Sequence, residues 1–364
     1  MTTIKALTYL GPGKISWQDV PMPTLVNDTD VIGKVLATTI CGTDLHIIKG
    51  DVPETTAIAQ ASHSKGIILG HEAIIEVTEC GDKVKNFKSG DVCIVSCITS
   101  CGDCYYCKRN IQAHCSGNEG SSGWIFGHEI DGSQAEYMRV PFADNGLFKA
   151  PDGIPFESLL MLSDAMPTSF EIGVINGEVK KGDVVAIVGL GPVGLGALLT
   201  ASIREPEKII AIDTDDSRLA LAKQLGATHT FNPSTDNVVT CVNELTTTDF
   251  KEKGVDVAIE CVGIPSTFEL CQDLICPGGR IANVGVHGKP VQLKLQELWI
   301  KNIKISTGLV SAYSTKELLD SISSGKINPS SMVSHKMKMS DFEEAYGIFK
   351  NAAGNKAIKM FLTP

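Results

Sequence analysis

This 364-residue sequence has no excess of positive charge. It contains 32 Lys and Arg and 42 Asp and Glu, which gives a formal net charge of −10. An acidic protein is a poor partner for nucleic acid or an anionic membrane surface. No apolar run approaches the length of a membrane span, and residues 1–5 lack the basic and apolar regions of a signal peptide. Internal repeats and low-complexity segments are absent too. These absences predict a soluble, cytoplasmic protein.

The first hundred residues have the pattern of short β-strands separated by turns, with strands expected at Ile4–Leu10, Asp30–Leu36 and Ile74–Thr78. Between them, Gly50–Gly66 is small and polar, which predicts a surface loop. The segment Pro141–Pro155 is rich in Pro, Gly and Asp and is expected to connect two domains.

From Val184 to about Ser306, strand and helix patterns alternate, which is typical of a parallel sheet covered by helices. The expected elements are a helix at Asp216–Leu225 and strands at Val255–Cys261 and Gly279–Gly285. Near the end of the chain, Ser340–Phe349 is predicted to be an amphipathic helix with Ser340 as N-cap and Glu343 completing a capping box. A closing strand is expected at Ala357–Leu362.

A glycine-rich turn follows the apolar run Val184–Val188 and carries Gly189, Gly191 and Gly194 in the G-x-G-x-x-G pattern. Pro192 and the apolar run Val193–Ala201 then predict a helix, because Pro is tolerated at a first helical position. Strand, glycine turn and helix together favour binding of a dinucleotide pyrophosphate. A glycine turn by itself can also serve only to pack a helix on a strand.

The next predicted strand, Lys208–Asp213, ends in an acidic side chain at the distance expected for a residue that binds the adenosine ribose. Asp213 would accept hydrogen bonds from both ribose hydroxyls and repel a 2′-phosphate, so NAD is predicted rather than NADP. Arg218 lies five residues further on, where it could contact the ribose region, and leaves NADP as the alternative.

Twelve cysteines are present, and six of them lie between Cys80 and Cys107. In a chain without a secretory signal, clustered cysteines indicate a metal site before a disulfide framework. Four cysteines with tight spacing suit a closed, structural zinc site, with an iron–sulfur cluster or four reduced thiols as alternatives. His114 is expected to be exposed rather than a ligand. The four residues are Cys101, Cys104, Cys107 and Cys115.

Two further segments combine cysteine, histidine and carboxylates beside glycine: Cys41-Gly-Thr-Asp-Leu-His46 and Gly70-His71-Glu72. Each residue alone is commonly an ordinary core residue. Taken in order with the four-cysteine lobe and the glycine turn, however, they resemble the zinc-dependent alcohol dehydrogenases of the medium-chain dehydrogenase family over essentially the whole chain. The resemblance implies a mostly β, GroES-like catalytic domain at residues 1–165, with the zinc lobe at about 97–118. It implies a Rossmann domain at 166–306 and a return to the catalytic domain at 307–364.

The resemblance implies a second, catalytic zinc bound by Cys41 and His71, with Asp164 as third ligand in place of the cysteine of the best-known members. The alternative for Asp164 is an exposed helix cap. Three protein ligands would leave one position open for the alcohol, which zinc makes more acidic. Glu72 is expected to approach the metal during ligand exchange, and Asp44 to orient the ring of His71.

A proton relay is also implied, in which Thr43 takes the proton of the alcohol and His46 passes it to solvent through the cofactor ribose. Histidine suits that last step because its free pKa lies near 6.5. Either side chain could instead serve only packing.

Several cofactor contacts rest on the resemblance alone. Thr168, Val262 and Val286 match positions that flank the nicotinamide, and Val193 lies in the glycine turn beside it. Lys359 stands where many members have an arginine near the glutamate of the zinc site, which leaves that role open.

The substrate is predicted from two side chains of the pocket. Cys97 occupies a position that is often a large aromatic residue, and its small side chain would leave room for the second carbon arm of a secondary alcohol. Trp124 resembles a pocket tryptophan of members that act on secondary alcohols. The alternatives are a further loose thiol for Cys97 and a surface-loop anchor for Trp124.

Other functions stay open from the sequence: a polyol dehydrogenase of the sorbitol type, a formaldehyde or glutathione-adduct dehydrogenase, and an NAD-binding protein without activity. The resemblance also implies a homodimer or homotetramer formed through the cofactor domain, and the lack of a long insertion after the lobe favours the tetramer.

Overall fold

The computed structural model describes residues 2–62, 65–118, 120, 122–247 and 253–364. The chain forms two compact units. Unit 1 comprises the chain up to Asp164 together with Ser311–Ser324 and Pro329–Pro364, and unit 2 comprises Ala165–Val310 and Gly325–Asn328. The short return of residues 325–328 to unit 2 had no signal in the sequence. No helix in the described part of the chain is both long and apolar enough to cross a membrane.

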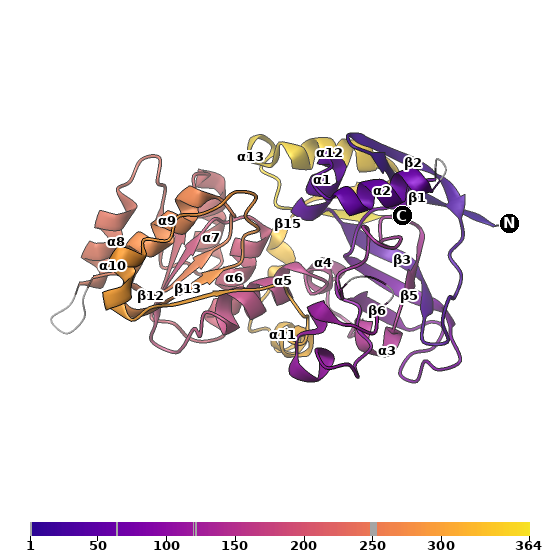
Figure 1. The fold of residues 1–364 in the computed structure, drawn as a ribbon, viewed down its shortest axis with the longest axis horizontal. Helices are drawn as coiled ribbons and strands as arrows, with labels where there is room; N and C mark the ends of the chain where they lie inside the picture. The colour runs from indigo at the N-terminus through magenta and orange to yellow at the C-terminus, as the bar shows by residue number, and fades with distance from the viewer. Residues whose placement is uncertain (1, 63–64, 119, 121, 248–252) are drawn as a thin grey trace. The chain divides into compact units, whose positions relative to one another are not determined.

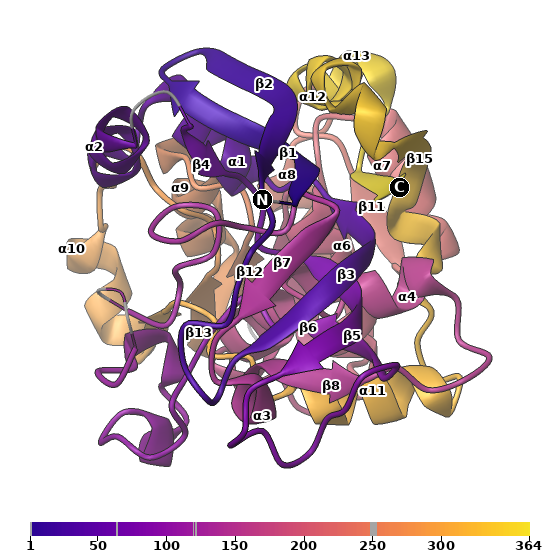
Figure 2. The same ribbon diagram turned by 90° about the vertical axis from the view of Figure 1, so that its right-hand side faces the viewer.

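Unit 1 is built on two sheets, and Figure 2 shows β3, β5, β6 and β8 side by side in the larger one. That sheet has seven strands in the order β15-β16-β3-β5-β6-β8, with β7 also paired to β3, and the smaller sheet has the order β2-β1-β4. All of these pairs are antiparallel except β15 with β16. The strands are β1 (Thr3–Gly11), β2 (Lys14–Pro21), β3 (Val31–Thr39), β4 (Ile67–Ile68), β5 (Ala73–Cys80), β6 (Val92–Val95), β7 (Tyr137–Val140), β8 (Leu147–Lys149), β15 (Val333–Lys338) and β16 (Lys359–Thr363).

The core of unit 1 lies where β-branched and aromatic side chains of these strands meet helix α12 (Phe342–Lys350). Leu7, Tyr9, Val35 and Ile75 are each 0% exposed there. The expected strands Ile4–Leu10, Asp30–Leu36, Ile74–Thr78 and Ala357–Leu362 are confirmed within a few residues at each end. The other helices of unit 1 are α1 (Gly42–Lys49), α2 (Pro53–Ala61), α3 (Ala143–Gly146), α4 (Phe156–Leu160), α11 (Thr315–Ser323) and α13 (Ala352–Asn355).

The prediction of a surface loop at Gly50–Gly66 is wrong for most of that segment, because α2 occupies Pro53–Ala61. Pro53 is placed at the start of the helix, where its missing N–H costs nothing. Buried Thr55 and Ala59 face the core, and the Thr56 hydroxyl lies 2.9 Å from the Tyr9 hydroxyl of β1. The segment has few apolar residues, so the sequence shows no helical periodicity there, and the helix depends on tertiary packing for its stability. Residues 63 and 64 lie outside the described part.

The segment Pro141–Pro155 is not a connection between the two units. It contains α3 and then β8, which pairs with β6 at the edge of the large sheet of unit 1. The chain passes from one unit to the other at Asp164 and Ala165 instead. Pro, Gly and Asp here make tight turns inside one unit, which composition cannot distinguish from a linker.

The helix expected at Ser340–Phe349 is present as α12, but its capping box is not. The helix begins at Phe342 with Asp341 as N-cap and without a side-chain cap hydrogen bond. The Ser340 hydroxyl donates to the Asp341 carboxylate at 2.9 Å, within the short 3-10 turn Met339–Asp341. A local side-chain bond therefore replaces the predicted bond to the helix backbone.

Unit 2 is a doubly wound parallel sheet of six strands in the order β11-β10-β9-β12-β13-β14. The chain order reverses between β9 and β12, which places a crevice at the carboxyl ends of these two strands. Helices α8 and α9 lie side by side (Figure 1). The strands are β9 (Val184–Val188), β10 (Lys208–Ile212), β11 (His229–Phe231), β12 (Val255–Glu260), β13 (Ile275–Asn283) and β14 (Lys304–Thr307). The helices are α5 (Ala165–Thr168), the π-helix Ser169–Ile175, α6 (Pro192–Ser202), α7 (Asp216–Gln224), α8 (Val238–Thr246), α9 (Pro265–Leu274) and α10 (Leu295–Leu298).

The predicted alternation of strands and helices in unit 2 is confirmed. All five residues of β9 are buried, as a strand covered on both faces requires. Strand β13 begins at Ile275 rather than Gly279, and its pairing with β12 shifts register between Val255 and Val257. The glycines at 278 and 279 made this first half of β13 resemble a turn.

Candidate active site

One cluster of possible metal ligands in unit 1 brings together Cys41, His71, Glu72 and Asp164, whose donor atoms all lie within 4.8 Å of one another. Cys41 is the N-cap of α1, directly after β3. His71 follows Gly70, and Asp164 precedes α5. The sequence therefore assembles this cluster from three distant segments.

Gly70 allows the chain to bring His71 into the cluster. Its φ of +92° lies in the left-handed region, and a Cβ atom there would stand 2.6 Å from the side chain of Gln134. No other residue fits this turn without displacing Gln134.

The distances fit a single bound zinc ion. A tetrahedral site with Zn–N, Zn–O and Zn–S lengths of about 2.0, 2.1 and 2.3 Å puts nitrogen about 3.4 Å and sulfur about 3.6 Å from the oxygen ligand. Asp164 Oδ2 lies 3.4 Å from His71 Nε2 and 3.7 Å from Cys41 Sγ. These three donors would hold the metal, and Asp164 is not an exposed cap, because its side chain is only 16% exposed.

The electrostatics of the cluster also favour a cation. Burial raises the pKa of Glu72, and Lys359 opposes that shift. Burial by itself lowers the pKa of His71, but hydrogen bonds to Asp164 and Cys41 outweigh it and hold that pKa well above its ordinary value. Without a metal, the site needs protons to balance crowded anionic donors; a divalent cation does so directly.

Glu72 forms a buried ion pair with Lys359. Its Oε1 lies 2.5 Å from Lys359 Nζ, and the two side chains are 1% and 2% exposed. The other oxygen, Oε2, is buried and has no hydrogen-bond partner among the described residues, while Oε1 lies 3.9 Å from His71 Nε2. A carboxylate in this position has one oxygen left to turn toward a metal.

Asp44 is held behind His71 by a network from three parts of unit 1. It accepts hydrogen bonds from the backbone N–H of Cys41 at 2.9 Å and from the Gln134 amide at 3.1 Å. The Tyr346 hydroxyl donates in turn to Gln134 at 2.9 Å. Asp44 Oδ1 lies 3.7 Å from His71 Nδ1, which is beyond hydrogen-bond length. Burial raises the pKa of Asp44, and His71 opposes that shift.

The two predicted relay residues differ in exposure. Thr43 Oγ1 lies 3.7 Å from Cys41 Sγ, so this hydroxyl borders the metal cluster. His46 is 62% exposed, and its Nδ1 lies 2.9 Å from Asp51 Oδ2. The left-handed Gly50 at the end of α1 turns the chain so that Asp51 reaches back to His46.

The two predicted pocket residues lie in unit 1. Cys97 is 2% exposed, and its Sγ lies 3.7 Å from Asp164 Oδ1, so it borders the metal cluster. Trp124 stacks on the ring of His128 with centroids 3.7 Å apart. Burial lowers the pKa of His128 to about 4, which keeps this ring neutral at physiological pH.

The second possible metal site consists of Cys101, Cys104, Cys107 and Cys115. Four sulfurs around one zinc, each about 2.3 Å from it, stand about 3.8 Å apart. Cys104 Sγ lies 3.5 Å from that of Cys107 and 4.0 Å from that of Cys115. Each of the twelve cysteines is free of disulfides, and His114 is exposed, as predicted. The four thiols therefore fit a closed zinc site.

In unit 2 the glycine turn has the close contacts that its pattern predicts. A Cβ atom on Gly194 would stand 1.8 Å from the carbonyl oxygen of Gly189, which itself has φ +92°. Gly191 is the N-cap of α6 and has open space around it. The carbonyl oxygen of Val193 accepts a hydrogen bond from Ser169 at 2.6 Å. The turn packs α6 tightly on β9 and leaves its N-terminus accessible to a ligand.

Asp213 follows β10 and reaches this turn. Its carboxylate accepts the backbone N–H of Leu190 at 2.6 Å and that of Asp215 at 2.9 Å. Arg218 Nη1 lies 3.8 Å from the same carboxylate. A carboxylate has about four acceptor positions, so these contacts leave room for ribose hydroxyls.

The residues predicted to flank the nicotinamide lie in unit 2. Val262 and Val286 follow β12 and β13 and are 44% and 85% exposed, which is high for apolar side chains. Thr168 ends α5.

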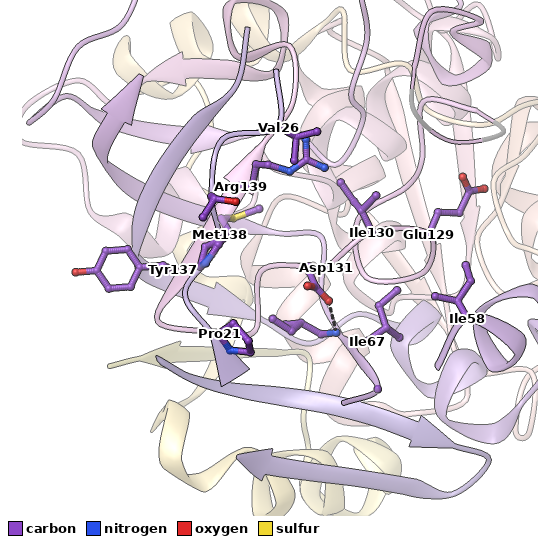
Figure 3. A pocket seen from close by; sticks show the side chains of 15 residues that line it. Pro21, Val26, Ile58, Ile67, Glu129, Ile130, Asp131, Tyr137, Met138 and Arg139 are labelled. Atoms are coloured by element: carbon purple, nitrogen blue, oxygen red, sulfur yellow. Dashed lines mark hydrogen bonds between the residues drawn. The ribbon is translucent and has the colours of Figure 1, made fainter. Parts of the chain in front are cut away.

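A further hollow of unit 1, with a volume of about 410 Å³, contains none of these metal donors (Figure 3). Its walls are a nearly even mixture of polar and apolar surface, and its charged members are Glu129, Asp131 and Arg139. Arg139 is paired with Asp30 at 2.8 Å, and Asp131 accepts the backbone N–H of Ile68 at 3.0 Å. These charges stabilise the local fold.

Two family profiles match the chain. Residues 27–152 match the "Alcohol dehydrogenase GroES-like domain", and residues 192–324 match the "Zinc-binding dehydrogenase" family. An alcohol dehydrogenase of Cupriavidus necator is 33% identical over 96% of this chain and 95% of its own length. The chain belongs to the zinc-dependent medium-chain alcohol dehydrogenases. The protein is therefore an alcohol oxidoreductase.

Solved structures of this alcohol dehydrogenase family resemble the chain over its whole length. Zinc-dependent alcohol dehydrogenase 2 of Streptococcus pneumoniae is 49% identical with a TM-score of 0.89, covering 99% of this chain and 98% of its own. An alcohol dehydrogenase of Thermus sp. ATN1 is 30% identical with a TM-score of 0.87, covering 99% of each chain.

Some residues of this alcohol dehydrogenase's site gave no signal in the sequence. Gln134, Tyr346 and Asp51 act on Asp44 and His46, and the first two are far from the segments that they contact. No local spacing links Gln134 to Asp44 or Tyr346 to Gln134, so only the fold brings these residues together. In the sequence, Lys359 differs from the arginine of many relatives and indicates no partner, whereas the structure pairs it with Glu72.

Proposed function

We propose that the protein is an NAD-linked dehydrogenase that interconverts secondary alcohols and ketones and binds two zinc ions per chain. The single observation that carries the proposal is the cluster of Cys41, His71 and Asp164, with distances suited to one zinc and with small, buried Cys97 beside it.

In the proposed reaction, Cys41, His71 and Asp164 would hold zinc, which would supply Lewis acidity, and bound NAD would supply the hydride acceptor. Thr43 lies close enough to Cys41 to accept a hydrogen bond from the substrate hydroxyl and pass its proton on. His46, with its ring against Asp51 and open to solvent, releases that proton to water. Asp44, whose Oδ1 lies 3.7 Å from His71 Nδ1, would orient the ring of His71 by its charge rather than by a direct hydrogen bond. Glu72, held by Lys359, serves ligand exchange at the metal.

The preference for a secondary alcohol rests on Cys97. A large aromatic ring at this buried position would fill space beside Asp164, whereas a thiol leaves it open for a second carbon arm. Cys97→Phe should therefore lower turnover of 2-butanol relative to ethanol by about tenfold, the effect of one or two methylene groups in a pocket. An unchanged ratio would exclude this role of Cys97.

The proposed preference for NAD over NADP rests on Asp213. A test of this preference is needed because a structural neighbour binds NADP. A structure from Sinorhizobium meliloti 1021, which is 25% identical with a TM-score of 0.84, contains bound NADP. In this chain a 2′-phosphate would approach the Asp213 carboxylate, which would repel it, while Arg218 is already 3.8 Å from that carboxylate. Asp213→Gly should reduce the preference for NAD over NADP, and unchanged selectivity would refute the assignment.

The proposed oligomer forms through unit 2. Strand β14 is an edge strand of its sheet, and Leu295, Trp299 and Ile300 near it are 60%, 68% and 68% exposed. Apolar side chains this exposed favour burial against another copy. The mass of the protein in solution distinguishes a dimer or tetramer from a monomer.

The deciding experiment measures initial rates with 2-propanol, 2-butanol, ethanol and sorbitol, each with NAD and NADP, on protein whose zinc content is known. Fast NAD-linked oxidation of the secondary alcohols with two zinc ions per chain is the expected result. If sorbitol is the best substrate, the protein is a polyol dehydrogenase instead. Zinc-loaded protein that oxidises none of these alcohols would overturn the substrate proposal.

A further inference from the structure

Glu260, the last residue of β12, is a fully buried carboxylate of unit 2 and belongs to neither group of possible metal ligands. It is 0% exposed, and its Oε1 accepts the backbone N–H groups of Val262 and Gly263, both at 2.9 Å. The Thr267 hydroxyl of α9 donates to the same oxygen at 2.6 Å. Burying a charge is costly unless hydrogen bonds compensate, so a side chain this well bonded fixes the loop after β12.

The backbone of the same residue fixes a second loop. The carbonyl oxygen of Glu260 accepts the N–H groups of Val284 at 2.8 Å and Gly285 at 3.1 Å, which follow β13. A Cβ atom on Gly285 would stand 2.4 Å from Glu260 Oε2, so this loop packs directly on the carboxylate. One residue thus organises the loops at the ends of two adjacent strands.

Glu260 Oε2 is the part of the carboxylate that no described residue hydrogen-bonds. It lies 3.5 Å from Nε2 of His287, which itself lies 2.8 Å from Asn283 Oδ1. The Glu260 carboxylate and the His287 ring therefore connect the end of the loop after β13 to the loop after β12.

Both loops stand where a parallel sheet of this order binds its ligand, beyond the carboxyl ends of the strands at the reversal of strand order. The first loop also touches the glycine turn, because a Cβ atom on Gly189 would stand 2.3 Å from Val262 Cγ2. Above this fixed backbone, Val262 and Val286 expose apolar side chains. Rigid loops with exposed apolar tips are suited to hold a flat ring.

We propose that Glu260 is the positioning residue for the nicotinamide end of the dinucleotide. It acts through the two loops that carry Val262 and Val286, and it does not contact the adenosine end. This inference rests on the proposed use of NAD.

The test compares NADH with ADP-ribose, which lacks the nicotinamide. Glu260→Gln keeps the size of the side chain but weakens the charge-assisted bonds to Val262, Gly263 and Thr267. We expect the Kd of NADH, measured by fluorescence titration, to rise about tenfold, while the Kd of ADP-ribose changes less than about twofold. Equal weakening of both ligands, or of neither, would overturn the inference.

Asp256→Asn is a matched control in the same strand. Asp256 lies near the opposite end of β12 and accepts the backbone N–H of Val184 at 2.7 Å. It should lower thermal stability without changing either Kd. A selective loss of NADH binding in this variant too would assign the effect to general loosening of the sheet.

Thr267→Val removes one of the three bonds to Glu260 and provides the test if Glu260→Gln does not fold. Its Kd for NADH should rise by about twofold to threefold with ADP-ribose unchanged. An unchanged Kd for NADH in this variant would also contradict the inference. Binding of NADH to the unsubstituted protein distinguishes the positioning role of Glu260 from the proposed use of NAD. If that protein does not bind NADH, the use of NAD itself is overturned.

Discussion

The two metal clusters of unit 1 differ in how the chain builds them. The four-cysteine lobe is made by the 15 residues from Cys101 to Cys115, whereas the other cluster draws on Cys41, His71 and Asp164. The lobe has four identical soft donors, which close a zinc site completely. The other cluster mixes sulfur, nitrogen and oxygen and contains a built-in cation, Lys359. A local motif suits a structural metal, and a site assembled by the fold suits chemistry.

The largest expected effect separates the two clusters by activity. His71→Ala removes a proposed ligand of the catalytic zinc, so turnover should fall by about a thousandfold, the loss of roughly 4 kcal/mol of Lewis-acid stabilisation. Zinc content should fall from two ions to one, with the lobe still loaded. Metal analysis and initial rates on the same sample measure both, and a variant that stays fully active would refute the assignment of the catalytic cluster.

The converse change breaks the lobe. Cys107→Ser removes one of its four sulfur donors, so the lobe zinc should be lost with about 3 kcal/mol of stability, which lowers Tm by roughly 6–12 °C. Turnover per remaining zinc at low temperature should change less than about twofold. Calorimetry and rates test this together; a collapse of turnover in fully folded protein would show that the lobe has a direct catalytic role.

Lys359 is the buried cation beside Glu72, and its removal should cost stability. Lys359→Met leaves the Glu72 carboxylate buried without its partner, at a cost of about 3 kcal/mol in the metal-free protein. Bound zinc should reduce that cost, because it supplies another cation near Glu72. Lys359→Arg, which keeps the charge, is the control. Equal unfolding free energies for the Met variant and the unsubstituted protein would exclude the buried ion pair as a stabilising contact.

The lobe should also bind zinc more tightly as pH rises. Burial raises the pKa of the Cys107 thiol to about 12, so this group is protonated in the metal-free lobe at neutral pH. Zinc must displace that proton, and affinity should rise about tenfold per pH unit for each proton displaced. Chelator competition in the His71→Ala background isolates the lobe. An affinity independent of pH would mean that the thiols are already ionised.

The smallest expected effect comes from making the two clusters more alike. Asp164→Cys gives the catalytic cluster a sulfur donor in place of oxygen, and zinc should stay bound because thiolate is a good zinc ligand. Turnover should change by no more than about tenfold, since the coordination number is kept. Asp164→Ala is the comparison, and it should lose the metal. If both variants lose zinc equally, the geometry of the site does not tolerate sulfur there.

The sequence revealed much of the fold where patterns are local. The buried strand Val184–Val188, the glycine turn and the alternation after it predict the parallel sheet, because each element is encoded by neighbouring residues. The helix α2 was not predicted because its small and polar residues become helical only when tertiary contacts stabilise them. The three-residue strand β8 was not predicted because the Pro, Gly and Asp residues around it resemble a linker. The failed capping box at Ser340 shows the same limit at a helix end.

By itself, the sequence determined the donor types, the lobe spacing and the glycine turn, because these depend on chemistry and on short stretches of chain. The tertiary structure decided which distant side chains meet. It placed Asp164 beside His71, Lys359 beside Glu72, and Tyr346 behind Gln134 and Asp44. It also brought the two loops of unit 2 that follow β12 and β13 into hydrogen bonds with Glu260. Such contacts join residues that are far apart in the chain, and only the packing of the core fixes their distances.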